Sequence, residues 1–138
     1  GFIEELQNNS NIKVYPKSAL STPTDDVLSK LFAELKREHP NLKLLYATNV
    51  DWGVAYGHYV HKHKLNYDIL TVDLTKEVAE LIKEGKIKAA IAQRAFSWVT
   101  SGLEILVDAF QNKPVVKYID TGTYEVNKSN ISIYEHRV

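Results

Sequence analysis

LKLLYATNVDW, residues 42–52, sets the architecture expected of the whole chain. Its first half, Leu42–Ala47, is a short apolar run that follows Pro40, and such a run is typical of a buried strand. Its second half is a polar corner at Asn49, followed by Asp51, which can cap the next helix by accepting backbone N–H bonds. A strand that leads into a helix through a polar corner is half of a βαβ unit. In open parallel sheets ligands bind outside the carboxyl ends of such strands, where Asn49 is expected to lie.

The same alternation of strand and helix continues on both sides of this stretch. Further strands are predicted at residues 12–15, 67–72, 87–92, 115–119 and 123–126. Helices are predicted at residues 2–6, 25–38, 51–64, 75–83 and 96–110, with one short helical turn in the tail. The pattern predicts an α/β fold with an open, mostly parallel sheet, helices on both of its faces and right-handed crossovers.

Two of these helices carry packing signals. The helix at 25–38 repeats apolar side chains three and four residues apart, at Val27, Leu28, Leu31, Phe32 and Leu35. In the helix at 51–64, Gly53 and Gly57 lie four residues apart. Glycines at this spacing would let the helix approach the sheet closely, at a cost of roughly 1 kcal/mol of helix propensity each.

Composition narrows the class of protein. The 138 residues are 44% hydrophobic and 25% charged, enough for one domain with one core. Seventeen basic and seventeen acidic residues give no net charge, so nothing supports a direct nucleic-acid partner for this segment. The chain contains no Cys, which rules out disulfides and thiolate metal sites. It begins at Gly1-Phe2 without Met, which suggests an excised or processed piece.

Polar side chains directly follow three of the predicted strands. These are Asn49, Asp73 and Gln93. Because parallel strands end at the same edge of a sheet, the three side chains are expected along one rim. A carboxylate accepts hydrogen bonds and an amide both donates and accepts, which suits the neighbouring hydroxyls of a polyol. The same residue types are also common as plain caps and turn formers at strand ends, and spacing alone leaves both interpretations open.

Signals for catalysis or metal binding are weak. Neither a Gly-x-Gly-x-x-Gly nor a Gly-x-Ser-x-Gly motif occurs, so no phosphate cradle or nucleophile elbow is predicted and the chain is not expected to be an enzyme. His58 and His61 lie one helical turn apart, but no acidic residue at helical spacing completes a metal shell. No catalytic residue, metal ligand or cofactor is therefore predicted.

Four segments together resemble a known family. They are Tyr46-Ala-Thr-Asn49, Thr71-Val-Asp73, Ala89-Ala-Ile-Ala-Gln93 and Lys117-Tyr-Ile-Asp-Thr-Gly122. Their order and spacing resemble those of type I periplasmic sugar-binding proteins, the ribose-binding-like receptors of ABC transporters, to which the effector domains of LacI-type repressors are related. In that family two α/β lobes close over a ligand. The resemblance implies that Asn49, Asp73 and Gln93 hydrogen-bond the ligand from the second lobe, with Gln93 also at the hinge.

The chain departs from this family in two ways. The first lobe is absent, so residues 1–93 and 123–138 are expected to form the second-lobe core. Residues 94–122 then correspond to a hinge crossover and a helix of the first lobe, which would leave an apolar stripe bare unless a dimer, a domain swap or a first-lobe fragment covers it. In addition, no aromatic residue lies near Pro23 to stack on a sugar ring, which leaves the ligand open.

The resemblance favours a non-catalytic ligand-binding lobe of a receptor for a sugar or a similar small polar solute. Such a receptor would work outside the cytoplasm, in the periplasm or as a membrane-anchored lipoprotein, and pass its solute to an ABC permease. The alternative is an effector-sensing domain of a LacI-type regulator, which would be cytoplasmic, or of a sensor kinase. Trp52 and Phe96 are added to the candidate ligand-binding residues, although Trp52 suits core packing equally well and Phe96 also fits the apolar helix stripe.

Overall fold

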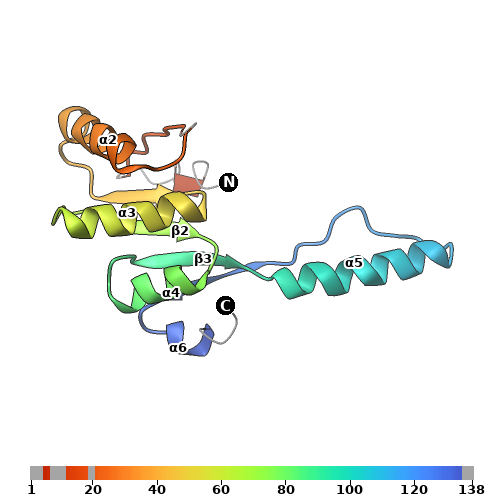
Figure 1. Ribbon diagram of the computed structural model, residues 1–138. Helices are drawn as coiled ribbons and strands as arrows, with labels where there is room; N and C mark the ends of the chain where they lie inside the picture. Colours follow the sequence, from red (N-terminus) through yellow and green to blue (C-terminus); the bar gives the residue numbers. More distant parts are fainter. Residues whose placement is uncertain (1–4, 7–11, 19–20, 135–138) are drawn as a thin grey trace.

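The fold is α/β, as predicted. The computed structural model describes residues 5–6, 12–18 and 21–134 (Figure 1). Its helices are α2 (Asp25–Glu38), α3 (Val50–Lys62), α4 (Lys76–Lys83), α5 (Ala95–Phe110) and α6 (Ile131–Tyr134). Its strands are β1 (Leu44–Ala47), β2 (Asp68–Val72), β3 (Ala89–Gln93) and β4 (Thr123–Asn127).

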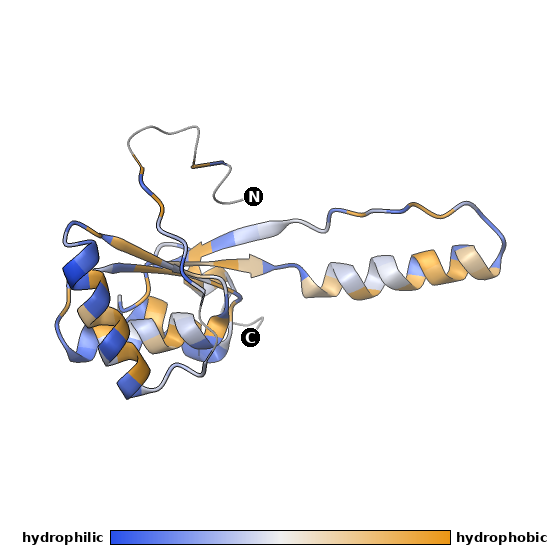
Figure 2. Cartoon of the chain, turned by 90° about the horizontal axis from the view of Figure 1, so that it is seen from above, coloured by the Kyte–Doolittle hydropathy of each residue, from blue (hydrophilic) through white to orange (hydrophobic). Residues whose placement is uncertain are grey.

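The strands form one open mixed sheet in the order β1-β2-β3-β4. β1 pairs with β2 and β2 with β3 in parallel, while β4 runs antiparallel to β3. Helices α2, α3 and α4 lie on one face of this sheet (Figure 2). The expectation of helices on both faces is therefore not met by these three helices. The helix predicted at 2–6 falls mostly outside the described residues. The buried core between sheet and helices includes Leu28, Phe32, Ile69, Val78, Ile82, Ile87, Ala90 and Val126.

Side-chain caps fix the helix starts near the predicted positions. Thr24 Oγ1 accepts a hydrogen bond from Val27 N (3.4 Å) at the start of α2, and Thr75 Oγ1 accepts one from Val78 N (3.2 Å) at the start of α4. An ion pair ties α2 to α3, because Lys62 Nζ lies 2.8 Å from an oxygen of Asp25. That hydrogen bond lowers the pKa of the Asp25 carboxyl.

Two predicted strands are wrong. Residues 12–18 are described without any strand, and they contact α2 instead: the Tyr15 ring stacks on His39 at 3.8 Å, and Lys17 pairs with Glu34. Residues 115–119 are also irregular, since they lie in a segment that leaves the sheet altogether. A short β-branched run becomes a strand only where a neighbouring strand offers it hydrogen bonds, and neither segment pairs with the described sheet.

The two glycines of α3 do bring this helix close to the sheet. Both are buried. A Cβ added to Gly53 would lie 2.0 Å from Thr71 Oγ1 on β2, and one added to Gly57 would lie 3.0 Å from Ile87 Cγ1. Only a residue without a Cβ fits at Gly53, so α3 packs directly on β2.

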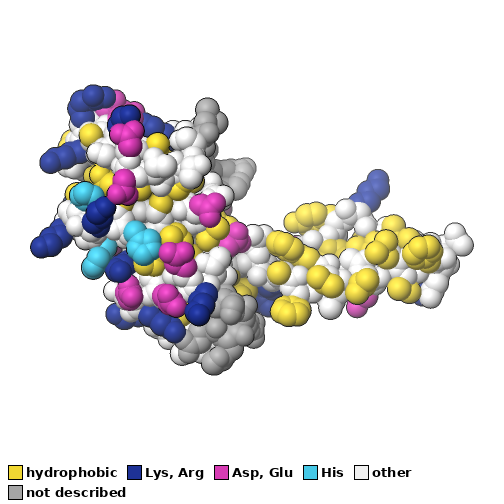
Figure 3. Space-filling view, viewed as in Figure 1, with side chains coloured by type: hydrophobic (Ala, Val, Ile, Leu, Met, Phe, Trp, Pro, Cys, Tyr) yellow, Lys and Arg dark blue, Asp and Glu magenta, His cyan; other side chains and the backbone are white. Residues whose placement is uncertain are grey.

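An arm projects from the body. It consists of α5 and the segment 111–122 that returns to β4, and both views show it extending away from the sheet (Figures 1 and 2). α5 has no buried residue. Its exposed large apolar side chains are Phe96, Trp98, Val99, Leu103, Leu106, Val107 and Phe110. In Figure 3 apolar side chains gather on this arm, whereas charged side chains and His are concentrated on the body.

No helix in the described part of the chain is long and apolar enough to cross a membrane.

Candidate functional site

The structure places the three predicted polar residues at the carboxyl ends of adjacent strands. Asn49 follows β1 by two residues, Asp73 follows β2 directly, and Gln93 is the last residue of β3. These strands are parallel neighbours, so their carboxyl ends meet at one edge of the sheet. We call the edge formed by Asn49, Asp73 and Gln93 the polar rim.

Two members of the polar rim are in direct contact. Gln93 Nε2 donates a hydrogen bond to Asp73 Oδ1 at 2.5 Å. Asp73 adopts a left-handed backbone, with φ of 67°, which Asp tolerates better than most residues. Its backbone N–H donates to the carbonyl of Ile91 at 2.9 Å, which anchors the end of β2 to β3. For hydrogen bonds to a ligand, the pair still has a second Asp73 oxygen and the Gln93 carbonyl as acceptors and a second Gln93 N–H as a donor.

Asn49 is the N-cap of α3. Its Oδ1 accepts hydrogen bonds from the backbone N–H groups of Asp51 (2.9 Å) and Trp52 (3.4 Å). The expectation that Asp51 caps this helix is therefore wrong, because α3 begins one residue earlier, at Val50, and Asp51 lies in its first turn. With its oxygen engaged, the Asn49 amide presents its NH₂ group, which makes no hydrogen bond to any described residue. Capping and ligand binding are thus compatible roles for this side chain.

The capping role of Asn49 can be tested by substitution. We expect Asn49→Ala to lower the free energy of unfolding by about 1 kcal/mol, because two N–H groups lose their acceptor. Asn49→Asp keeps an acceptor oxygen at the same place and is expected to change stability much less. Urea unfolding followed by circular dichroism measures both. Equal stability of Asn49→Ala and the wild type would show that the cap contributes nothing.

The two aromatic candidates differ in their surroundings. Trp52 is partly buried, packs on the core cluster, and meets the Tyr56 ring edge-on at 5.5 Å between centroids. This environment favours core packing, although its position three residues after Asn49 keeps it near the rim. Phe96 lies on the arm with 86% of its surface exposed, among the apolar side chains of α5. The structure does not bring Phe96 into contact with the polar rim.

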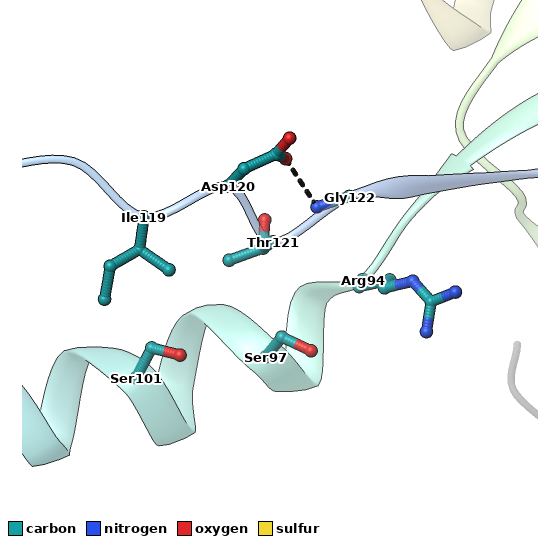
Figure 4. Close-up of a pocket in the computed structure, with 7 residues that line it drawn as sticks. All are labelled: Arg94, Ser97, Ser101, Ile119, Asp120, Thr121 and Gly122. Atoms are coloured by element: carbon teal, nitrogen blue, oxygen red, sulfur yellow. Dashed lines mark hydrogen bonds between the residues drawn. The ribbon is translucent and has the colours of Figure 1, made fainter.

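A cavity of about 400 Å³ lies next to the rim, at the root of the arm (Figure 4). It separates the start of α5 from the returning segment, and it is lined by Arg94, Ser97, Ser101, Ile119, Asp120, Thr121 and Gly122. Asp120 Oδ1 accepts from Gly122 N at 2.8 Å, and the Arg94 guanidinium lies 5.8 Å from the centre of the Tyr124 ring. No motif in the sequence points to this cavity, because its two walls are about twenty residues apart along the chain.

The His cluster does not form a metal site within the described residues. No group of three or more His, Cys, Asp or Glu side chains there could hold a metal ion. His58 Nε2 instead lies 3.0 Å from Glu77 Oε1, so this side chain connects α3 to α4.

Several solved structures of solute-binding transport proteins share this fold. A sugar-binding protein of a sugar ABC transporter from Bacillus halodurans is 26% identical, with a TM-score of 0.68 over 76% of this chain and 40% of that one. A carbohydrate transporter solute-binding protein from Agrobacterium radiobacter, in complex with D-arabinose, is 19% identical, with a TM-score of 0.78 over 95% of this chain and 45% of that one. An ABC transporter solute-binding protein from Agrobacterium vitis, bound to α-D-tagatopyranose, is 20% identical, with a TM-score of 0.79 over 95% and 44%.

Sequence comparisons alone give no assignment, since no protein-family model matches the chain and no curated protein matches it. The structural matches confirm the predicted architecture, which is one lobe of a periplasmic-binding-protein-like α/β fold. The chain spans between 40% and 45% of the length of these three proteins.

Proposed function

We propose that this chain is one ligand-binding lobe of a two-lobed receptor that captures a sugar or a similar small polar solute for an ABC transporter, and that it catalyses no reaction. The observation that carries the proposal is the polar rim. Asn49, Asp73 and Gln93 lie together at the carboxyl ends of three neighbouring strands, which is where open α/β sheets bind ligands. The sugar-binding proteins that share the fold support the solute class.

The chemistry of the rim suits hydroxyl groups. A sugar hydroxyl donates one hydrogen bond and accepts others, so it needs both kinds of partner. Asp73 presents acceptor oxygens, and Asn49 presents donors because its oxygen is engaged in the cap. Gln93 offers one donor and one acceptor beyond its bond to Asp73. None of the three is a nucleophile, and the arrangement therefore favours recognition.

The other lobe of the receptor would cover the arm. We assign residues 1–93 and 123–138 to this lobe and residues 94–122 to the crossover and first-lobe helix. Each large apolar side chain left in water forgoes roughly 1.5–3 kcal/mol of burial, and α5 exposes seven of them. A first lobe that buries this stripe would also close over the polar rim by turning about the root of the arm. Such a receptor would work outside the cytoplasm, in the periplasm or as a lipoprotein, with an ABC permease as its partner.

No observation on this chain favours the alternative of a LacI-type regulator or a sensor kinase.

The proposal is tested by titrating the complete two-lobed receptor with a panel of pentoses and hexoses that includes D-arabinose and D-tagatose. Isothermal titration calorimetry should detect one saturable site for at least one sugar, and that sugar should raise the melting temperature. A panel of amino acids serves as the control and should give no heat of binding. Absence of binding for every sugar, or preferential binding of an amino acid, would contradict the proposed solute class.

The arm leads to a prediction for the isolated chain. Without a first lobe, the 138-residue chain is expected to form a dimer or domain swap that buries the stripe of α5. Leu103→Glu combined with Leu106→Glu should yield a monomer, because two charges cannot be buried against an apolar partner. Multi-angle light scattering measures the mass, and Ser101→Glu, on the side of α5 that faces the cavity, is the matched control. A wild-type mass equal to one chain would refute self-association.

A further inference from the structure

Two connections link the arm to the body, α5 and the segment 111–122, and a side-chain hydrogen bond joins them near the root of the arm. Trp98 Nε1 donates a hydrogen bond to Thr121 Oγ1 at 2.8 Å. Trp98 belongs to the outgoing helix α5, and Thr121 to the segment that returns to β4. We infer that this hydrogen bond, which we call the brace, couples α5 to the returning segment so that the two move together as one rigid unit. The coupling thereby keeps Gln93 of the polar rim in position.

The start of α5 and the returning segment are not packed closely along the whole of their length. The cavity of about 400 Å³ lies between them, and its walls carry Ser97 and Ser101 on one side and Asp120 on the other (Figure 4). Where side chains do not interdigitate, a directional hydrogen bond has more influence on how the two segments move. At the far end of the arm a separate ion pair links the end of α5 to the returning segment, with Lys113 Nζ 3.2 Å from Asp108 Oδ1.

The backbone between the brace and the sheet is suited to rotation. Arg94, with φ of −89° and ψ of 67°, joins β3 to α5 and has no side-chain cap bond. Gly122, with φ of 70°, joins the returning segment to β4. Few torsions need to change for the arm to turn at these two residues, one in each connection.

The brace lies next to the rim in the strand register. Gln93 and Thr123 are the last paired residues of β3 and β4, directly inside Arg94 and Gly122. If the two connections turned independently, this terminal pair would be pulled apart first, and Gln93 would lose its alignment with Asp73. Trp98 and Thr121 are therefore assigned as positioning residues that act on the rim without touching the solute.

The brace can be tested on this chain by measuring distances between spin labels. Because the sequence has no Cys, cysteines introduced at exposed Glu80 on α4 and Gln111 at the arm tip carry the only labels. Samples are diluted with unlabelled chain so that only distances within one chain are recorded. Trp98→Phe keeps the ring and Thr121→Val keeps the shape, while each removes one partner of the hydrogen bond. Both variants should broaden the distance distribution relative to the wild type.

A matched control comes from the same arm. Among the described residues, Thr100 Oγ1 donates only to backbone carbonyls of its own helix, those of Phe96 (3.1 Å) and Ser97 (3.3 Å). Thr100→Val should leave the distribution unchanged. Unchanged distributions in Trp98→Phe and Thr121→Val, or equal broadening in Thr100→Val, would overturn the brace.

The effect on solute binding rests on the proposed function. In the complete receptor, both brace variants should weaken sugar binding by about twofold to tenfold, the range expected for one net hydrogen bond. Unchanged affinity would contradict the link between brace and rim. If the wild-type receptor binds no sugar, the proposed function fails, and the distance measurement still decides whether the brace exists.

Discussion

Replacing Gly53 by alanine is expected to lower the free energy of unfolding by about 3 kcal/mol. The added Cβ would lie 2.0 Å from Thr71 Oγ1 and 2.5 Å from Thr71 Cβ, far inside van der Waals contact. Thr71 is fully buried on β2, so it cannot move aside, and α3 must lift from the sheet. Alanine is also the better helix former, which means that the loss would arise in spite of a favourable propensity of about 1 kcal/mol.

Gly102 provides the matched control for this prediction. It also lies inside a helix, but a Cβ added there meets nothing within 4 Å. Gly102→Ala is therefore expected to leave stability unchanged or to raise it slightly. Urea unfolding followed by circular dichroism compares both variants with the wild type. A Gly53→Ala variant as stable as Gly102→Ala would show that α3 does not pack on β2 as the structure has it.

Replacing Asp73 by alanine in the complete receptor is expected to weaken sugar binding by about 100-fold. The substitution removes the charged acceptor of the rim and also leaves Gln93 Nε2 without the partner it has at 2.5 Å. A lost hydrogen bond to a charged group and a stranded donor together correspond to about this factor. Gln93→Ala should have a smaller effect of about tenfold, because it removes a neutral amide and leaves the Asp73 carboxylate in place.

Asp68 is a suitable control because it lies on β2, the strand that Asp73 directly follows. It occupies the amino end of β2, is exposed, and lies 3.4 Å from Lys88 Nζ. Asp68→Ala removes the same charge at the far end of the strand and should leave sugar affinity unchanged. Calorimetric titration measures all three variants. If Asp73→Ala binds as tightly as Asp68→Ala, the rim is not the binding site.

Much of the fold was predictable because the local signals agree with one another. The run ending at Ala47, the glycines of α3 and the Thr caps each favour the element in which they are found. The failures concern segments whose state depends on a distant partner. The run at 12–15 looks like a strand in isolation, yet it contacts α2 through Tyr15 and Lys17 and pairs with no described strand. No local sequence pattern shows whether a neighbouring strand is available for pairing.

The placement of the three rim residues was predictable, but their contacts were not. That Asn49, Asp73 and Gln93 share one edge follows from parallel strands. The bond between Asp73 and Gln93, twenty residues apart, depends on the neighbouring positions of β2 and β3 and on the left-handed backbone of Asp73. The Trp98 brace was not predictable either, because it joins a helix to an irregular segment by a single long-range contact.

The central claim is that the polar rim hydrogen-bonds sugar hydroxyls at the carboxyl ends of the strands. A crystal structure of the complete receptor with its tightest-binding sugar tests it most directly. We expect sugar hydroxyls within hydrogen-bond distance of Asn49 Nδ2, an oxygen of Asp73 and the amide of Gln93. A sugar bound elsewhere, with these three side chains turned away from it, would contradict the account.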